Sequence, residues 1–116
     1  MTNRARRNRA AASIKEYATE VLNAFYDAYR DRYEMLEVGP DDYGDIYCVL
    51  ECPDDVLVVC TISMKNGYEC RLDYAFDDIE DIVESDVIGL TNDPRSSARL
   101  IHDTIEGYIS EIEVYV

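Results

Sequence analysis

Residues 46–74, IYCVLECPDDVLVVCTISMKNGYECRLDY, decide the fold that the sequence predicts. The stretch is rich in β-branched and aromatic residues, and two short groups of turn-forming residues, at 53–55 and 65–67, divide it into three parts. This pattern is typical of short strands joined by tight turns. The stretch therefore predicts a three-stranded antiparallel meander.

The register of the predicted strands follows from their period of two. A two-residue Asn-Gly turn would mix apolar and polar residues on each face, which a sheet with one buried face does not allow. A three-residue turn that ends at Gly67 pairs Met64 with Tyr68, and glycine suits the left-handed conformation that this position needs. The same reasoning at the first turn places Cys48 opposite Cys60. One face, to be covered by helices, then carries Ile46, Cys48, Leu50, Cys52, Val56, Val58, Cys60, Ile62, Met64, Tyr68, Cys70, Leu72 and Tyr74.

The opposite face of the predicted sheet is mixed, with an apolar island on polar surroundings. Such an island is a candidate surface for oligomerisation. Ordinary surface hydrophobicity is the alternative explanation. The island consists of Tyr47, Val49, Leu57 and Val59.

A long helix is expected before the meander. Apolar residues recur at spacings of three and four from about Ala10 to about Leu36, which predicts an amphipathic helix. The Gly39-Pro40 pair is expected to stop this helix.

Two further helices are expected after the meander. Residues 77–89 predict a short helix with Gly89 at its end and three apolar residues facing inward, namely Ile79, Ile82 and Val83. A longer helix then begins with Asp93 as N-cap and Pro94 in its first turn. Its buried stripe is expected to be Ala98, Ile101, Ile105, Tyr108, Ile109 and Ile112.

The predicted class is therefore α+β: a long N-terminal helix, a three-stranded antiparallel meander, then a short and a longer C-terminal helix packed on one sheet face. The order helix, three strands, helix resembles that of double-stranded-RNA-binding domains. The last helix opens with DPRSSARLIHD rather than with their basic cluster, and an acidic body repels phosphates. The resemblance therefore extends to topology and not to function.

Charge is distributed unevenly along the 116 residues, whose net charge is −14. The first nine residues contain no acid and four arginines, Arg4, Arg6, Arg7 and Arg9. We interpret residues 1–9 as a flexible basic arm and residues 10–116 as one acidic α+β domain. The arm is a candidate contact for a partner or for nucleic acid, and a floppy terminus is the alternative.

Catalytic and metal-binding patterns are missing from the sequence. The four cysteines have no Cys-x-x-Cys spacing and are expected to be buried free thiols, so no metal and no cofactor are predicted. His102, the single histidine, lies at the edge of a predicted buried stripe and suits a structural role. Because no group supplies nucleophile, base and orienting residue together, we do not expect an enzyme.

Carboxylates are the remaining candidate functional groups. Dense acidic stretches on a rigid scaffold can imitate the phosphates of a duplex and can be steered rapidly into a basic groove. A solvated acidic surface, or adaptation to salt, is the alternative. The candidate partner-binding acids are Asp41, Asp42, Asp45, Asp77, Asp78, Glu80, Asp81, Glu84 and Asp86.

In size, charge and lack of catalytic motifs the chain resembles small phage-encoded inhibitors of host defence, including anti-CRISPR proteins, which share no common motif. The resemblance implies a non-enzymatic inhibitor that binds a nucleic-acid enzyme or ribonucleoprotein with a basic groove. The sequence contains no apolar run long enough to span a membrane, and no apolar segment follows the arginines as it would in a secretory signal. We therefore expect no membrane contact and a location in the cytoplasm. If the chain is phage-encoded, this is the cytoplasm of the host cell. The alternatives are an assembly protein that oligomerises through the outer sheet face and a nucleic-acid binder that uses the arginine arm.

Overall fold

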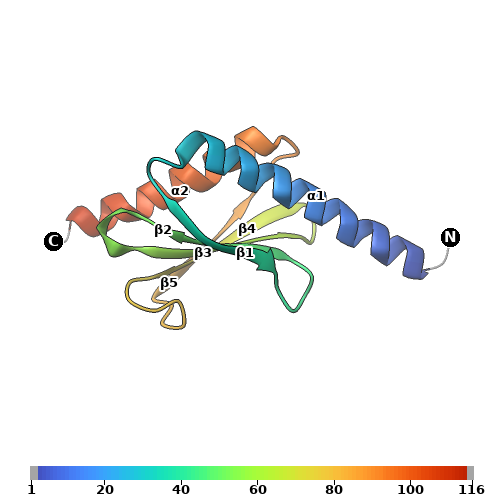
Figure 1. Ribbon diagram of the computed structural model, residues 1–116, viewed down its shortest axis with the longest axis horizontal. Helices are drawn as coiled ribbons and strands as arrows, with labels where there is room; N and C mark the ends of the chain where they lie inside the picture. The colour runs from blue at the N-terminus through green and yellow to red at the C-terminus, as the bar shows by residue number, and fades with distance from the viewer. Residues whose placement is uncertain (1–2, 115–116) are drawn as a thin grey trace.

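The protein is a two-layer α+β structure. The computed structural model describes the backbone of residues 3–114 and the side chains of residues 14–112. Its strands form one antiparallel sheet in the order β1-β2-β3-β4-β5, so the whole sheet is a meander. Both helices lie on the same side of this sheet (Figure 1). The elements in chain order are α1 (Asn3–Tyr29), β1 (Glu34–Pro40), β2 (Ile46–Glu51), a 3-10 turn η1 (Pro53–Asp55), β3 (Leu57–Met64), β4 (Tyr68–Ala75), β5 (Glu84–Gly89) and α2 (Pro94–Val114).

The three central strands have the register that the sequence predicts. Cys48 pairs with Cys60, and Met64 pairs with Tyr68 across a three-residue turn. Gly67 closes this turn with φ at +149°, a value that favours glycine. The predicted inner face is buried under the helices except at the turn, where Met64 is exposed and Tyr68 is half-buried.

The prediction for residues 30–40 is wrong. Helix α1 ends at Tyr29, and the following residues form the edge strand β1, in which Gly39 and Pro40 lie instead of stopping a helix. This strand supplies partners for the backbone groups of β2 that would otherwise be unpaired. Pro40, at the end of β1, is tolerated there because an edge strand does not need every N–H.

The prediction of a short helix at 77–89 is also wrong. Residues 84–89 form β5, which pairs with β4, and residues 76–83 form an irregular connection. The Asp78 carboxylate accepts a hydrogen bond from the Glu80 amide at 3.0 Å, and this local bond competes with helix formation. Three apolar residues expected to face inward are instead exposed: Ile79, Ile82 and Val83.

The core lies between the inner sheet face and the two helices. The predicted stripe of α2 is buried from Ala98 to Ile109, with Ile112 half-buried, and the Asp93 carboxylate caps the helix by accepting the Ser96 amide at 3.2 Å. Tyr17 joins α1 to this layer, because its hydroxyl contacts Ser97 Oγ at 2.8 Å. Within the described residues, neither helix has an apolar stretch long enough to cross a membrane.

Candidate interaction surfaces

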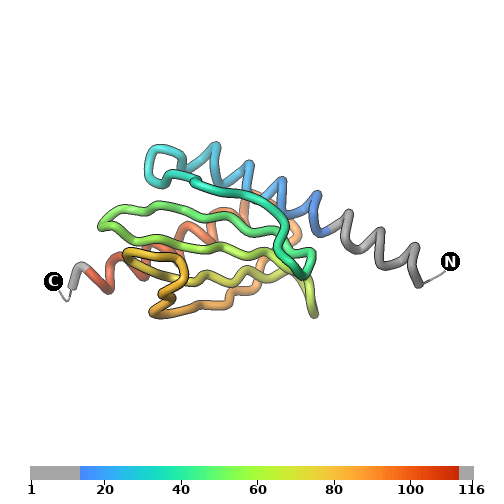
Figure 2. Tube along the Cα trace, turned by 60° about the horizontal axis from the view of Figure 1, so that its bottom comes forward, coloured from blue at the N-terminus to red at the C-terminus, as the bar shows by residue number. Residues whose placement is uncertain are grey.

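The predicted acidic residues fall into two groups at opposite ends of the sheet. Ile46 pairs with Ile62, so the β1–β2 turn lies beside the β3–β4 turn. Leu57 pairs with Ala75, so the β4–β5 connection lies at the other end. Figure 2 shows these two ends far apart. The structure thus separates Asp41, Asp42 and Asp45 from the larger group on the connection and β5, and the nine acids do not form one continuous surface.

The end that carries the β4–β5 connection, which we call the acidic end, also gathers acids that the sequence analysis missed. Turn η1 brings Asp54 and Asp55 to the same end of the sheet as the connection. The register predicted for β3 and β4 already contained this signal, since it placed the η1 turn beside the end of β4. The acidic end consists of seven exposed carboxylates, Asp54, Asp55, Asp77, Asp78, Glu80, Asp81 and Glu84.

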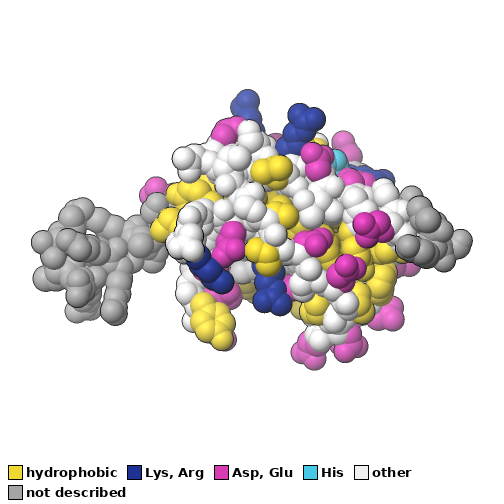
Figure 3. All heavy atoms as spheres, turned by 180° about the vertical axis from the view of Figure 1, so that it is seen from behind, with side chains coloured by type: hydrophobic (Ala, Val, Ile, Leu, Met, Phe, Trp, Pro, Cys, Tyr) yellow, Lys and Arg dark blue, Asp and Glu magenta, His cyan; other side chains and the backbone are white. Residues whose placement is uncertain are grey.

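The acidic end also exposes apolar side chains. Phe76, Ile79, Ile82 and Val83 have exposed fractions between 38% and 59%. Hydrophobic and acidic side chains lie next to one another at this end of the molecule (Figure 3). None of the ion pairs formed by the described side chains involves the seven carboxylates. The acidic end therefore combines uncompensated negative charge with apolar contact area.

Asp86 has a different environment from the other acids of its group. Its carboxylate accepts a hydrogen bond from the Tyr74 hydroxyl at 2.9 Å. Burial raises the pKa of Tyr74, and this hydrogen bond raises it further. The Tyr74 ring in turn stacks on Tyr108 of α2, with ring centroids 3.8 Å apart. Asp86 thus helps to hold β4, β5 and α2 together.

The β1–β2 turn uses its acids locally. The Asp41 carboxylate accepts the amides of Tyr43 at 2.8 Å and Asp45 at 3.0 Å, which stabilises the turn. Burial raises the pKa of Asp45. The turn borders a depression of about 530 Å³ on the outer sheet face, and Lys65 and Arg71 also line it. Of these three acids only Asp42 is exposed, and Asp41 and Asp45 are half-buried.

The predicted oligomer face is present but offers little apolar area. Val49 and Val59 lie opposite one another on β2 and β3. Val49 is only 4% exposed, and Tyr47, Leu57 and Val59 are half-buried. The side chains of Arg4, Arg6, Arg7 and Arg9 lie outside the described residues, so their role stays a prediction.

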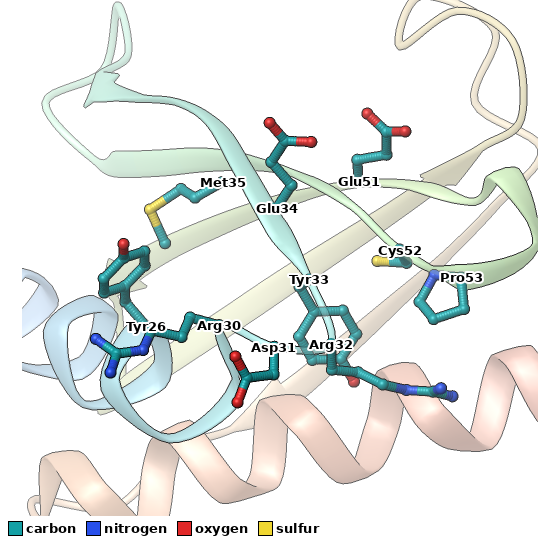
Figure 4. Close-up of a pocket in the computed structure, with 10 residues that line it drawn as sticks. All are labelled: Tyr26, Arg30, Asp31, Arg32, Tyr33, Glu34, Met35, Glu51, Cys52 and Pro53. Carbon is teal, nitrogen blue, oxygen red and sulfur yellow. The ribbon is translucent and has the colours of Figure 1, made fainter.

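A depression of about 790 Å³ lies between the end of α1 and strands β1 and β2 (Figure 4). The Arg30 and Arg32 guanidinium groups point away from one another there, so they do not form a joint anion site. Arg32 instead binds Glu106 of α2 through two hydrogen bonds of 2.7 and 2.8 Å. Tyr33 donates to Glu106 at 2.6 Å and contacts His102 Nδ1 at 2.8 Å.

This network joins the start of β1 to α2. The Arg32 and Tyr33 hydrogen bonds lower the pKa of Glu106 to about 2, with the Arg32 bond the larger cause. His102 also stacks on Tyr29, with centroids 3.9 Å apart. The polar groups of this network bond to one another and do not converge on the depression. We therefore interpret the network as a structural clamp between β1 and α2.

The four cysteines are buried free thiols, as predicted. Cys60 and Cys70 have their sulfur atoms 3.2 Å apart, and Cys48 lies opposite Cys60. Burial raises the pKa of Cys52 to about 12. Among the described residues, no group of three or more histidine, cysteine or acidic side chains is arranged to hold a metal ion.

We expect all four thiols to resist alkylation in the folded protein. The thiolate is the reactive form, and burial keeps the reagent away from all four thiols. Iodoacetamide at pH 7.5, followed by mass spectrometry, should leave the native chain unmodified and label four cysteines in denaturant. Rapid labelling of Cys52 in the native protein would contradict its burial.

The fold and surfaces define a small α+β protein with an acidic, partly apolar end. Comparisons with protein-family models, with curated proteins and with solved structures find no match for this chain. Its function must therefore be argued from its own residues.

Proposed function

We propose that the chain is a non-enzymatic inhibitor or binding protein of the phage-encoded anti-defence, anti-CRISPR-like type. Its acidic end would occupy a basic groove of a nucleic-acid enzyme or ribonucleoprotein in the cytoplasm of the host cell. The observation that carries this proposal is the presence of seven exposed carboxylates at one end, none of them in an ion pair with another described residue.

The energetic basis of the proposal is charge complementarity. Like charges held close together on a surface repel one another, and a basic partner relieves this repulsion while it accelerates encounter. The exposed apolar residues of the β4–β5 connection add contact area that a purely phosphate-like surface lacks. The assembly function takes second place because none of the four residues of the predicted oligomer face is exposed.

A charge-reversal experiment tests the role of the acidic end. The double variant Glu80→Lys/Asp81→Lys should weaken binding to a basic-grooved enzyme, such as a guide-RNA-loaded nuclease, by about tenfold or more. The control Glu20→Lys/Asp42→Lys makes the same change in net charge at exposed positions away from the acidic end and should have a much smaller effect. Calorimetric titration measures both affinities.

Salt dependence provides the second arm of this test. Affinity should fall as ionic strength rises, since salt screens exposed charges. An affinity that is indifferent to salt, or that responds equally to both double variants, would overturn the electrostatic proposal.

A further inference from the structure

Strand β5 is an open edge of the sheet. The sheet order ends at β5, where four of the six residues are exposed and the other two are half-buried, with Val87 63% exposed. Figure 2 shows β5 at the margin of the sheet, with no described segment alongside it opposite β4. Exposed edges present backbone groups to which another chain can pair.

The register shows which backbone groups of β5 are free. The Leu90 amide donates to the Tyr68 carbonyl at 2.8 Å, directly after the registered pair of Glu69 and Gly89. Opposed residues of an antiparallel ladder alternate between hydrogen-bonded and non-hydrogen-bonded pairs. Since Leu90 is hydrogen-bonded to Tyr68, every second residue before it, Ile88 and Asp86, is also hydrogen-bonded to its partner on β4. The outward N–H and C=O groups therefore belong to Ser85, Val87 and Gly89.

The other edge, β1, is a poorer template for pairing. Its register shifts between Met35 and Glu37, and its last residue, Pro40, has no N–H to donate. The described part of β5 has neither a register shift nor a proline across its six paired residues. Of the two edges, β5 is the one that can hold an added strand over its full length.

The side chains of β5 specify what such a strand must carry. Glu84 and Asp86 lie on the helix side of the sheet, because they pair with the inward-facing Tyr74 and Leu72. Glu111 of α2 adds a third carboxylate on this side. Burial raises the pKa of the intervening Tyr108, and these three carboxylates raise it further. On the opposite side β5 presents the apolar Val87.

We infer that β5 accepts an extended segment of the protein partner as a sixth strand, with lysine or arginine on its helix-side positions and apolar residues on alternate positions. This inference rests on the proposed function and specifies how the partner is held. The backbone of the added strand bonds to Ser85, Val87 and Gly89, its cations meet Glu84 and Asp86, and its apolar residues cover Val87. A second copy of β5 does not fit, because antiparallel self-pairing puts the carboxylates of both copies on one face.

A peptide experiment tests strand addition directly. The probe is a capped peptide of about six residues in which lysine and valine alternate. Its matched control has the same composition with lysines and valines in two separate blocks. The alternating peptide should bind about tenfold more tightly in calorimetry, a factor of ten being about 1.4 kcal/mol. Equal affinities would overturn strand addition and leave only charge attraction.

Hydrogen exchange of the wild-type chain locates the peptide without any mutation. The amides of Ser85, Val87 and Gly89 should become protected in the complex, and that of Val38 on the other edge should not. Protection at β1 alone, or at neither edge, would overturn the inference.

Proline substitution links the peptide result to the partner. Val87→Pro removes an outward N–H and should weaken both peptide and partner binding by about tenfold. Val38→Pro is the matched control, since the bond between Asp41 and Asp45 places the Val38 amide outward on β1. If Val87→Pro keeps its affinity for the enzyme while the acidic-end reversals lose theirs, strand addition falls and the proposed function stands. If Val87→Pro and the acidic-end reversals all bind the enzyme normally, both strand addition and the proposed function are overturned.

Discussion

Ile105→Ala is expected to lower the free energy of unfolding by about 3 kcal/mol. Ile105 lies in the middle of α2 with no exposed surface and belongs to the core between helices and sheet. Shortening this side chain removes buried apolar surface and leaves a cavity that the closely packed neighbours fill only in part. Equilibrium urea denaturation followed by circular dichroism measures the loss.

The control for Ile105 is on the same helix. Leu100 is 38% exposed, so Leu100→Ala makes a similar chemical change at a place that water already reaches. Its expected cost is under about 1 kcal/mol. Equal losses of unfolding free energy for the two variants would show that α2 does not pack against the core through the face that carries Ile105.

Glu106→Gln is expected to cost about 2 kcal/mol at pH 7. The substitution keeps the size of the side chain and removes the charge that holds Arg32 and Tyr33. The Glu106 side chain is 26% exposed, so solvent screening keeps the cost below what its pKa shift alone would suggest. The same denaturation assay applies, with Glu111→Gln, an exposed carboxylate of α2, as the control.

The contribution of Glu106 should depend on pH in a defined direction. Its pKa is about 2 in the folded protein against an ordinary value of 4.5, so as pH falls the unfolded chain binds a proton first. Stability is therefore present above about pH 4.5 and is lost as pH falls toward 2. The difference between wild type and Glu106→Gln should shrink across this window. A constant difference would contradict the charged clamp.

The sequence predicted the centre of the sheet well and its edges poorly. Residues 46–74 alternate strictly and contain two turns of defined length, so local chemistry alone sets their register. In β1 the register shift between Met35 and Glu37 interrupts this alternation. The spacing of Tyr29, Tyr33 and Leu36 then imitates a helix.

The sequence pattern does not predict strand β5, for a different reason. Its helix-side positions include Glu84 and Asp86, the reverse of the usual pattern in which apolar residues face inward. Ile79, Ile82 and Val83 have helical spacing although they are exposed. Inward-pointing charges are typical of edge strands that must not aggregate, and they remove the signal by which a strand is recognised.

The candidate site was predicted in composition but not in arrangement. The acids of residues 77–86 were singled out from the sequence, whereas the sheet topology moved Asp41, Asp42 and Asp45 to the opposite end. It also brought Asp54 and Asp55 to the acidic end. Hydrogen bonding then separated Asp86, which holds Tyr74, from the freely exposed carboxylates.

By itself the sequence determined the central meander, the buried stripe of α2, the burial of the cysteines and the acidic character of the chain. These features depend on residue type and on spacings within short segments. Only the tertiary structure decided that residues 34–40 and 84–89 are strands, which carboxylates lie together and which edge stays open. An edge strand forms because a neighbouring strand has backbone groups to pair, and that condition is met only once the neighbour is in place.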